Sequence, residues 1–263
     1  MNDHRSAVNP GMAGLAGLSV LFFLLPLAGL VIRAPWGSMA SVITSKSSLD
    51  ALGLTLVASL ATTALALAFG FPLAWLLARG RFPGQTSLRG LTTLPMVLPP
   101  VVGGIALLMA YGRRGMIGAP LYHATGLSLP FTTPGVIVAE SFVAMPFFVI
   151  TVESGLRTMD TRLEDAARSL GASRWTVFRR VTLPLIAPSM IAGAVLAWSR
   201  AVGEFGATIT FAGNLPGVTQ TAPLAIYISQ TTNHLDEAIA LSLVLVAVSL
   251  AVMLGTRSRR RAG

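Results

Sequence analysis

Residues Leu163 to Pro184 read LEDAARSLGASRWTVFRRVTLP, and this arginine-rich segment separates stretches of chain that are otherwise strongly apolar. Its first half is predicted to form a short helix in which Glu164 faces Arg168 one turn on, an order that stabilises an isolated helix. Gly171 suits the left-handed residue that ends a helix, and Ser173 can cap the next one. The spacing therefore predicts a helix, a glycine turn and a second helix, which the final proline stops.

The arginine-rich segment also has features of a docking surface. Ala166 and Ala167 keep one face of the first helix narrow, so that another protein can approach closely. Trp175 and Phe178, three residues apart, give the second helix an apolar edge. The alternative is a solvated loop beside the membrane. The need for charge in such a loop would not explain why Ala-Ala, Gly and Leu-Pro occur at these spacings. We expect the segment to bind a soluble partner.

Composition indicates an integral membrane protein. The chain has 263 residues, of which 53% are hydrophobic and only 11% charged, whereas about a quarter of residues carry charge in ordinary soluble domains. The net charge is +9, but 18 of the 19 basic residues are Arg and lie mainly between or after apolar runs. That distribution indicates membrane topology and argues against a nucleic-acid surface. The absence of Cys and the scattered His4, His123 and His234 exclude disulfides and an evident metal cluster.

Six apolar runs are long enough to cross a bilayer, which takes roughly 20 residues as helix. They cover about 12–32, 51–78, 90–112, 133–156, 185–210 and 237–256. The first run exceeds the usual core of a signal peptide and lacks a clear cleavage site, so we predict a membrane helix there. The fold class is all-α membrane protein, with an N-terminal helix and external loop (1–49), a membrane domain (50–255) and a basic tail (256–263).

The positive charges predict the orientation of these spans. With the odd-numbered loops outside, the cytoplasmic side receives 14 Arg: Arg5, Arg79, Arg81, Arg89, six between 157 and 180, and four in the tail from Arg257 on. The outer side receives only Arg33, Lys46, Arg113 and Arg114. The excess of basic residues inside predicts that both termini and residues 157–185, which include the arginine-rich segment, are cytoplasmic.

Three prolines mark the third run as a candidate wall of a pathway. Pro95, Pro99 and Pro100 fall within six positions, and each leaves a backbone carbonyl without its helical partner. Such carbonyls are tolerated at membrane depth where they are buried in protein or face a watery cavity. The prediction is a kinked helix beside the pathway; a packing kink without solute contact is the alternative.

Glu140, Arg200 and Glu204 are charged residues inside the predicted spans, where a charge normally faces a cavity or a partner. Arg200 and Glu204 are four apart, on one face of the predicted fifth span, and Glu140 lies near the outer end of the fourth. We expect a charged cluster at the external gate. The alternative is a neutralised pair that only fixes helix packing. The long external segment 211–236 is mixed in character and can fold back over the pore mouth.

The arginine-rich segment resembles the signature of ABC-importer permeases. The matching residues are Asp165-Ala166-Ala167, then Gly171, then Val181, Leu183 and Pro184. Asp165 stands where that family usually has Glu, and Glu164 immediately precedes it. The resemblance implies that this element is the cytoplasmic coupling helix, which sits in a cleft of the ATP-hydrolysing subunit.

Further stretches resemble the molybdate and sulfate permeases within that family. They are Ser199–Asn214 in and after the fifth run, Leu98–Val102 in the third run and Arg81–Gly84 before it. Within and after the first of these stretches, Thr208–Phe211 and Thr219–Thr221 are more similar to the molybdate permeases than to the sulfate permeases. The resemblance covers roughly 50–255. It implies a type I importer fold in a bacterial or archaeal inner membrane, a homodimer, two ATPase subunits that hold ATP and Mg²⁺, and an external solute-binding protein.

The sequence predicts a permease and not an enzyme. It contains no P-loop motif, and its only Lys is Lys46 in an external loop, so ATP is expected to be hydrolysed by a separate subunit. A secondary transporter would show repeated halves, and a membrane enzyme would need a nucleophile-base pair or metal cluster; neither is evident. Molybdate or tungstate is the expected solute, with sulfate or thiosulfate as the alternative.

Overall fold

The computed structural model describes residues 10–259, and the elements in this range are helices joined by turns and loops. Predictions for Arg5 and for residues 260–263 concern positions outside this range, and the side chains of Arg257 and Arg259 are not described either. Within residues 10–259, five helical stretches are long and apolar enough to span a membrane, and a bent pair raises the number to six. The prediction of an all-α membrane protein is confirmed.

Four of the predicted spans are continuous helices close to the expected bounds. They are α1 (Pro10–Ile32), the α3–α4 rod, α8 (Thr133–Thr158) and α14 (Leu235–Arg259). The rod joins α3 (Lys46–Leu65) to α4 (Phe71–Arg79) through a π-helical turn, η1 (Ala66–Gly70). Such turns interrupt the regular hydrogen-bond ladder without ending the helix.

The third predicted span is broken and not merely kinked. Helix α5 (Gln85–Val97) and helix α6 (Pro100–Tyr111) meet at 120°. Leu98 and Pro99 between them are extended, with ψ of 136° and 131°. A residue that precedes proline is pushed out of the helical region, and here two prolines follow each other. Pro100 then starts the new helix, where its missing N–H costs nothing.

The fifth predicted span, 185–210, is wrong at both ends. The continuous helical stretch is Arg174–Val202, made of α10 (Arg174–Val177), the π-helical turn η2 (Phe178–Thr182) and α11 (Leu183–Val202). Pro184 therefore does not stop the second short helix. The turn η2 widens the backbone directly before this proline, where its ring would otherwise clash with a carbonyl four residues earlier. At the other end, Gly203 closes α11, and α12 (Gly206–Phe211) is a separate helix.

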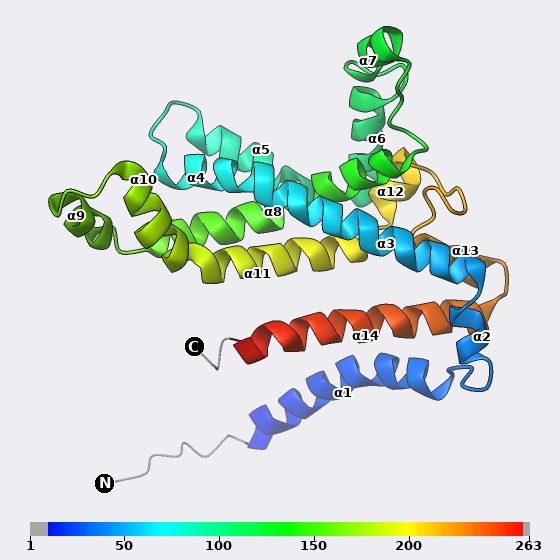
Figure 1. Cartoon of the computed structure of the whole chain (residues 1–263). Helices are drawn as coiled ribbons and strands as arrows, with labels where there is room; N and C mark the ends of the chain where they lie inside the picture. Colours follow the sequence, from blue (N-terminus) through cyan, green and yellow to red (C-terminus); the bar gives the residue numbers. More distant parts are fainter. Residues whose placement is uncertain (1–9, 260–263) are drawn as a thin grey trace.

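Helices α8, α11 and the α3–α4 rod run side by side, and the shorter helices gather at their two ends (Figure 1). At one end lie α9 (Arg162–Ser169) and α10; at the other lie α12 and α13 (Ala222–Thr231). The 211–236 segment thus contains a helix, α13, that packs against α14 and α3. Helix α2 (Met39–Ile43) adjoins α14, while α6 and α7 (Gly118–Thr125) project sideways. The first turn of α1 and the last turn of α14 lie on the side of α9 (Figure 1).

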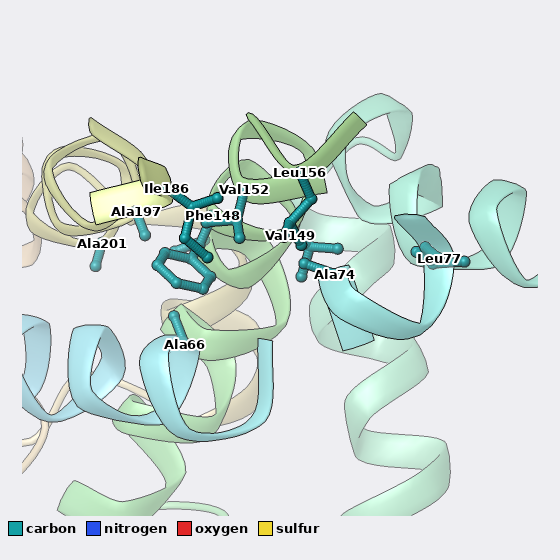
Figure 2. Packing of buried hydrophobic residues seen from close by; sticks show 11 residues of the cluster. Ala66, Ala74, Leu77, Phe148, Val149, Val152, Leu156, Ile186, Ala197 and Ala201 are labelled. Atoms are coloured by element: carbon teal, nitrogen blue, oxygen red, sulfur yellow. The ribbon is translucent and has the colours of Figure 1, made fainter. Parts of the chain in front are cut away.

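The largest buried cluster joins α8 to α11, η1 and α4, with Phe148 at its centre (Figure 2). Two glycines allow the helices to approach this ring: a Cβ at Gly70 would lie 2.9 Å from it, and one at Gly193 3.1 Å. Such tight contacts mean that even one added methyl group would be felt. The core therefore holds α8, α11 and the rod together between the two ends.

Candidate functional site

The turn in the arginine-rich segment has the predicted geometry. Gly171 has φ +84°, its N–H donates to the carbonyl of Arg168 at 2.9 Å, and the N–H of Ala172 donates to that of Ala167 at 3.1 Å. This pair of hydrogen bonds is typical of a helix that ends with a left-handed residue. The hydroxyl of Ser173 accepts from the N–H of Thr176 at 3.2 Å and caps the second helix, as expected.

Glu164 is buried, 3% exposed, and its main partners are not the predicted one. Arg79 at the end of α4 donates two hydrogen bonds to its carboxylate, at 2.9 and 3.1 Å, and the hydroxyl of Thr182 donates a third at 2.6 Å. The closest approach of Arg168 is 3.9 Å. The expected pair with Arg168 is thus the weakest contact, because Arg79, 85 residues away in sequence, occupies the carboxylate. No local pattern reveals that partner.

Opposing influences act on the Glu164 carboxyl. Burial raises its pKa, but the hydrogen bonds from Thr182 and Arg79 and the positive charges of Arg79 and Arg168 lower it, and the net pKa lies below the ordinary value of 4.5. Hydrogen bonds and cations favour the charged form. The group is therefore ionised at neutral pH and holds its three donors.

The remaining surface of the arginine-rich segment is open. Asp165 is 67% exposed at its side chain and pairs with Arg168 at 3.1 Å, while Ala166 is also exposed. Leu170 and Trp175 are 89% and 67% exposed. Beside them lies an open groove of about 640 Å³, lined by Trp75, Arg79, Glu164, Arg168, Arg174, Val177, Phe178 and Thr182. Exposed apolar side chains among charges are typical of a protein-binding surface.

The last three residues of the signature lie where the arginine-rich segment enters the helix bundle. Val181 belongs to η2, and Leu183 and Pro184 form the first turn of α11. Val181 and Leu183 are half-buried, whereas Pro184 is exposed. A displacement of α10 would therefore reach α11 through the continuous helical stretch Arg174–Val202.

A second charged cluster near the same end was not predicted. Glu153 of α8 pairs with Arg89 of α5 at 2.8 Å and with Arg157 at 2.9 Å. Both guanidiniums also donate to the carbonyl of Leu77 in α4, at 3.2 and 3.1 Å, and the amide of Gln85 donates to it at 2.7 Å. The cluster ties α4, α5 and α8 together. Glu153 lies inside the predicted fourth span with Arg157 four residues on, a signal that sequence reasoning missed.

At the opposite end, the structure pairs Arg200 with Glu204. The guanidinium Nη2 lies 2.5 Å from the carboxylate Oε2, and the side chains are 27% and 1% exposed. The other carboxylate oxygen accepts from the N–H of Ala207 at 2.8 Å, in the first turn of α12. Because α11 ends at Val202, the pair bridges a helix end and the following turn, and does not lie along one helix as predicted.

Glu140 joins this end of the bundle from α8. It is 1% exposed and accepts from the hydroxyl of Thr62 in α3 at 3.2 Å. The preceding residue, Ala139, packs in one buried cluster with Ala207, whose N–H donates to Glu204. The structure thus brings the three charged residues into one region, with Thr62 as an added neighbour that sequence reasoning did not name.

The three prolines occupy different positions. Pro95 lines an apolar groove of about 350 Å³ between α5, α6, α8 and the rod. Pro99 and Pro100 are exposed at the break between α5 and α6. Pro100 also packs against α12, since a Cβ on Gly206 would lie 2.7 Å from its ring. The break therefore leads directly to the helix that follows the Arg200–Glu204 pair.

Comparison with known proteins assigns the family. Residues 70–258 match the binding-protein-dependent transport system inner membrane component family. The chain belongs to this family. It is a multi-pass inner-membrane permease, and the match includes the arginine-rich segment, the α5–α6 break and the Arg200–Glu204 pair.

Individual proteins similar to this chain are also permeases of transport systems. The molybdenum transport system permease protein ModB of Mycobacterium tuberculosis is 46% identical over 254 residues, which cover 97% of this chain and 94% of that one. The protein of the same name in Escherichia coli is 43% identical, over 81% and 96%. The sulfate transport system permease protein CysT of Escherichia coli is 35% identical, over 94% and 91%.

The fold has solved counterparts among ABC importers. A bacterial ABC transporter involved in the import of the acidic polysaccharide alginate contains a chain with TM-score 0.73 and 20% identity, and the match covers 95% of each chain. At that identity the likeness concerns the fold alone. The architecture is that of a type I ABC importer permease.

Proposed function

We propose that this chain forms the membrane pathway of an ATP-driven importer of a tetrahedral oxyanion, with molybdate as the solute and tungstate as a close competitor. The observation that carries the proposal is the 46% identity to a molybdenum permease over 97% of the chain, against 35% to a sulfate permease over a similar length. Sulfate is the second candidate, because the chain is also 35% identical to a sulfate permease.

The chemistry of the outer end supports an anionic solute. A dianion that crosses a low-dielectric layer needs either compensating charge or a hydrated cavity. Arg200 offers a guanidinium that is 27% exposed, while its buried partner Glu204 balances the charge of the empty state. Weak attraction of this kind suits release of the solute.

The proposed assembly is a homodimer with two ATPase subunits and an external solute-binding protein, with both termini in the cytoplasm. Helix α5 presents Leu91 and Val97, which are 66% and 83% exposed, next to half-buried Thr92 and Thr93. These exposed apolar side chains suit contact with a second copy of the chain. On the cytoplasmic side, Leu170 and Trp175 supply apolar anchors for the ATPase, which holds ATP and Mg²⁺.

The test is uptake into proteoliposomes that contain this permease and its ATPase, with ATP inside and the binding protein outside. Labelled molybdate should accumulate only with ATP, unlabelled tungstate should compete strongly, and Arg200→Gln should slow uptake. Accumulation of sulfate without molybdate would move the assignment to the sulfate group. Accumulation of a neutral or cationic solute alone would overturn the oxyanion proposal.

A further inference from the structure

The carboxylate of Glu164 faces into the protein although its helix forms the proposed docking surface. Its neighbour Asp165 is 67% exposed at the side chain, whereas Glu164 is 4% exposed there. A docking partner on the exposed side of α9 would meet Asp165 first and reach Glu164 last. Glu164 is therefore free to do something other than contact the ATPase.

Glu164 binds both helices that lead from the arginine-rich segment towards the membrane core. One set of bonds comes from Arg79, the last residue of α4, in a two-pronged guanidinium-carboxylate pair. The other comes from Thr182, the last residue of η2, which continues into α11. Two-pronged pairs fix orientation as well as distance. Helix α9 is thus held at a fixed angle to α4 and η2 at once.

The end of α4 is in turn connected to the rest of this side of the molecule. Two residues before Arg79, the carbonyl of Leu77 accepts hydrogen bonds from Gln85 and Arg89 of α5 and from Arg157 of α8. The guanidinium carbon of Arg79 lies over the ring of Trp75, 5.6 Å from the ring centre. The last turn of α4 therefore joins two sets of polar contacts, one to α9 and one to α5, whose far end is the break at Leu98 and Pro99.

We propose that Glu164 is a positioning residue that makes α9, the end of α4 and η2 move as one body when the ATPase displaces α9. The inference rests on the proposed function, because it concerns how ATP hydrolysis is linked to transport. Loss of the carboxylate leaves the docking surface in place but breaks the link to α4. Hydrolysis then continues while the pathway no longer follows it, so that the coupling between the two sites is lost.

The first experiment measures ATP hydrolysis and solute uptake in the same proteoliposomes. Glu164→Gln and Arg79→Gln should each lower the amount of solute taken up per ATP about ten-fold, with the same amount of ATPase copurified. Arg81→Gln is the matched control, since Arg81 is exposed two residues from Arg79, and should leave that ratio unchanged. The pair Arg79→Glu with Glu164→Arg should restore much of it. Equal ratios in wild type and Glu164→Gln would overturn the proposal.

A structural readout separates transmission from docking or folding. The chain contains no Cys, so spin labels can be attached at Ser169→Cys in α9 and Leu76→Cys in α4, both exposed. In the complex, the distance between the labels should stay the same with and without ATP, and in Glu164→Gln it should change on ATP binding. A distance that changes equally in both would contradict the rigid link. If Glu164→Gln does not fold, Arg79→Gln removes the same two-pronged pair from the α4 side and should show the same change. An unchanged distance in that variant would then count against the link.

The two proposals fail in different ways. A wild-type complex that shows no ATP-dependent oxyanion uptake contradicts the proposed function, whatever the variants do. A wild-type complex that transports, together with Glu164 and Arg79 variants that transport with the same solute per ATP, contradicts only the role of Glu164. A loss of uptake that matches a loss of bound ATPase would make Glu164 a docking residue and would also overturn the positioning role.

Discussion

The guanidinium of Arg200 and the carboxylate of Glu204 form an ion pair across the end of α11, with 2.5 Å between Nη2 and Oε2. The pair is asymmetric: Glu204 is almost fully buried, but Arg200 keeps 27% of its side chain exposed. Glu204 also accepts the N–H of Ala207. One side chain thus joins the end of α11 to the start of α12, beside the break between α5 and α6.

This asymmetry predicts unequal effects of removing each partner. Arg200→Gln leaves a buried, unpaired carboxylate and should destabilise the permease by about 3 kcal/mol, whereas Glu204→Gln should cost less because Arg200 can reach solvent. The double variant should cost less than the sum of the two. Thermal unfolding of the purified permease in detergent gives the three values. Additive effects would mean that the two residues do not interact.

Gly171 provides a second prediction, based on its backbone. Its φ of +84° is unfavourable for residues with a Cβ, but a Cβ there would meet no atom within 4 Å. Gly171→Ala should therefore destabilise the turn by about 1 kcal/mol through backbone strain alone. Gly171→Asn, which tolerates this conformation, should cost less, and Gly171→Asp should uncouple transport by adding a charge. Equal behaviour of the Ala and Asn variants in ATPase copurification and thermal unfolding would argue against a strained turn.

The sequence was sufficient for what depends on local chemistry. Hydrophobic run length located four continuous spans, and the capping pattern located Gly171 and Ser173, because helix length and turn geometry follow from neighbouring residues. It also marked the region of Pro99, although a kink was expected where the chain breaks through 120°. Two successive prolines were the available sign of a break.

Partners distant in sequence could not be predicted. Arg79 and Glu164 are 85 residues apart, and nothing local distinguishes Arg79 from Arg81. Local reasoning therefore assigned Glu164 to Arg168, which in the structure is its most distant cation at 3.9 Å. The expectation that Pro184 ends a helix failed for a related reason, because the π-helical turn before it is not encoded in a recognised residue pattern.

Glu153 provides a third prediction, since one carboxylate holds two guanidiniums. Glu153→Gln leaves Arg89 and Arg157 facing each other without an anion, and should lower thermal stability about twice as much as Arg157→Gln. In Arg157→Gln, by contrast, the buried carboxylate of Glu153 keeps Arg89 at 2.8 Å and stays paired. Thermal unfolding of both variants tests this, and a larger loss in Arg157→Gln than in Glu153→Gln would contradict it.

Gly104 provides a fourth prediction about the contact of α6 with α12. A Cβ at Gly104 would lie 2.5 Å from Cβ of Thr210, so Gly104→Ala must push the helices apart at a cost of about 1–3 kcal/mol. Gly90→Ala in α5 is the control: no atom lies within 4 Å, and helix propensity should make that variant slightly more stable. Adding Thr210→Gly to Gly104→Ala should recover part of the loss. Two equally tolerated alanine variants would refute the close packing.

The lowered pKa of Glu164 makes the attachment of α9 sensitive to acid. A carboxyl whose pKa is lower in the folded than in the unfolded state stabilises the fold above its unfolded pKa, and this contribution is lost as pH falls through the folded value. Here that window lies below about pH 4.5, the ordinary value from which the pKa of Glu164 is lowered. Wild type should therefore unfold at a higher temperature than Glu164→Gln by a constant margin from pH 8 to about pH 5, and the margin should shrink at lower pH. Below the window both side chains are neutral, so the two proteins should converge. A margin that grows on acidification, or that disappears between pH 8 and pH 6, would show that the ionised Glu164 does not hold Arg79 and Thr182 in solution.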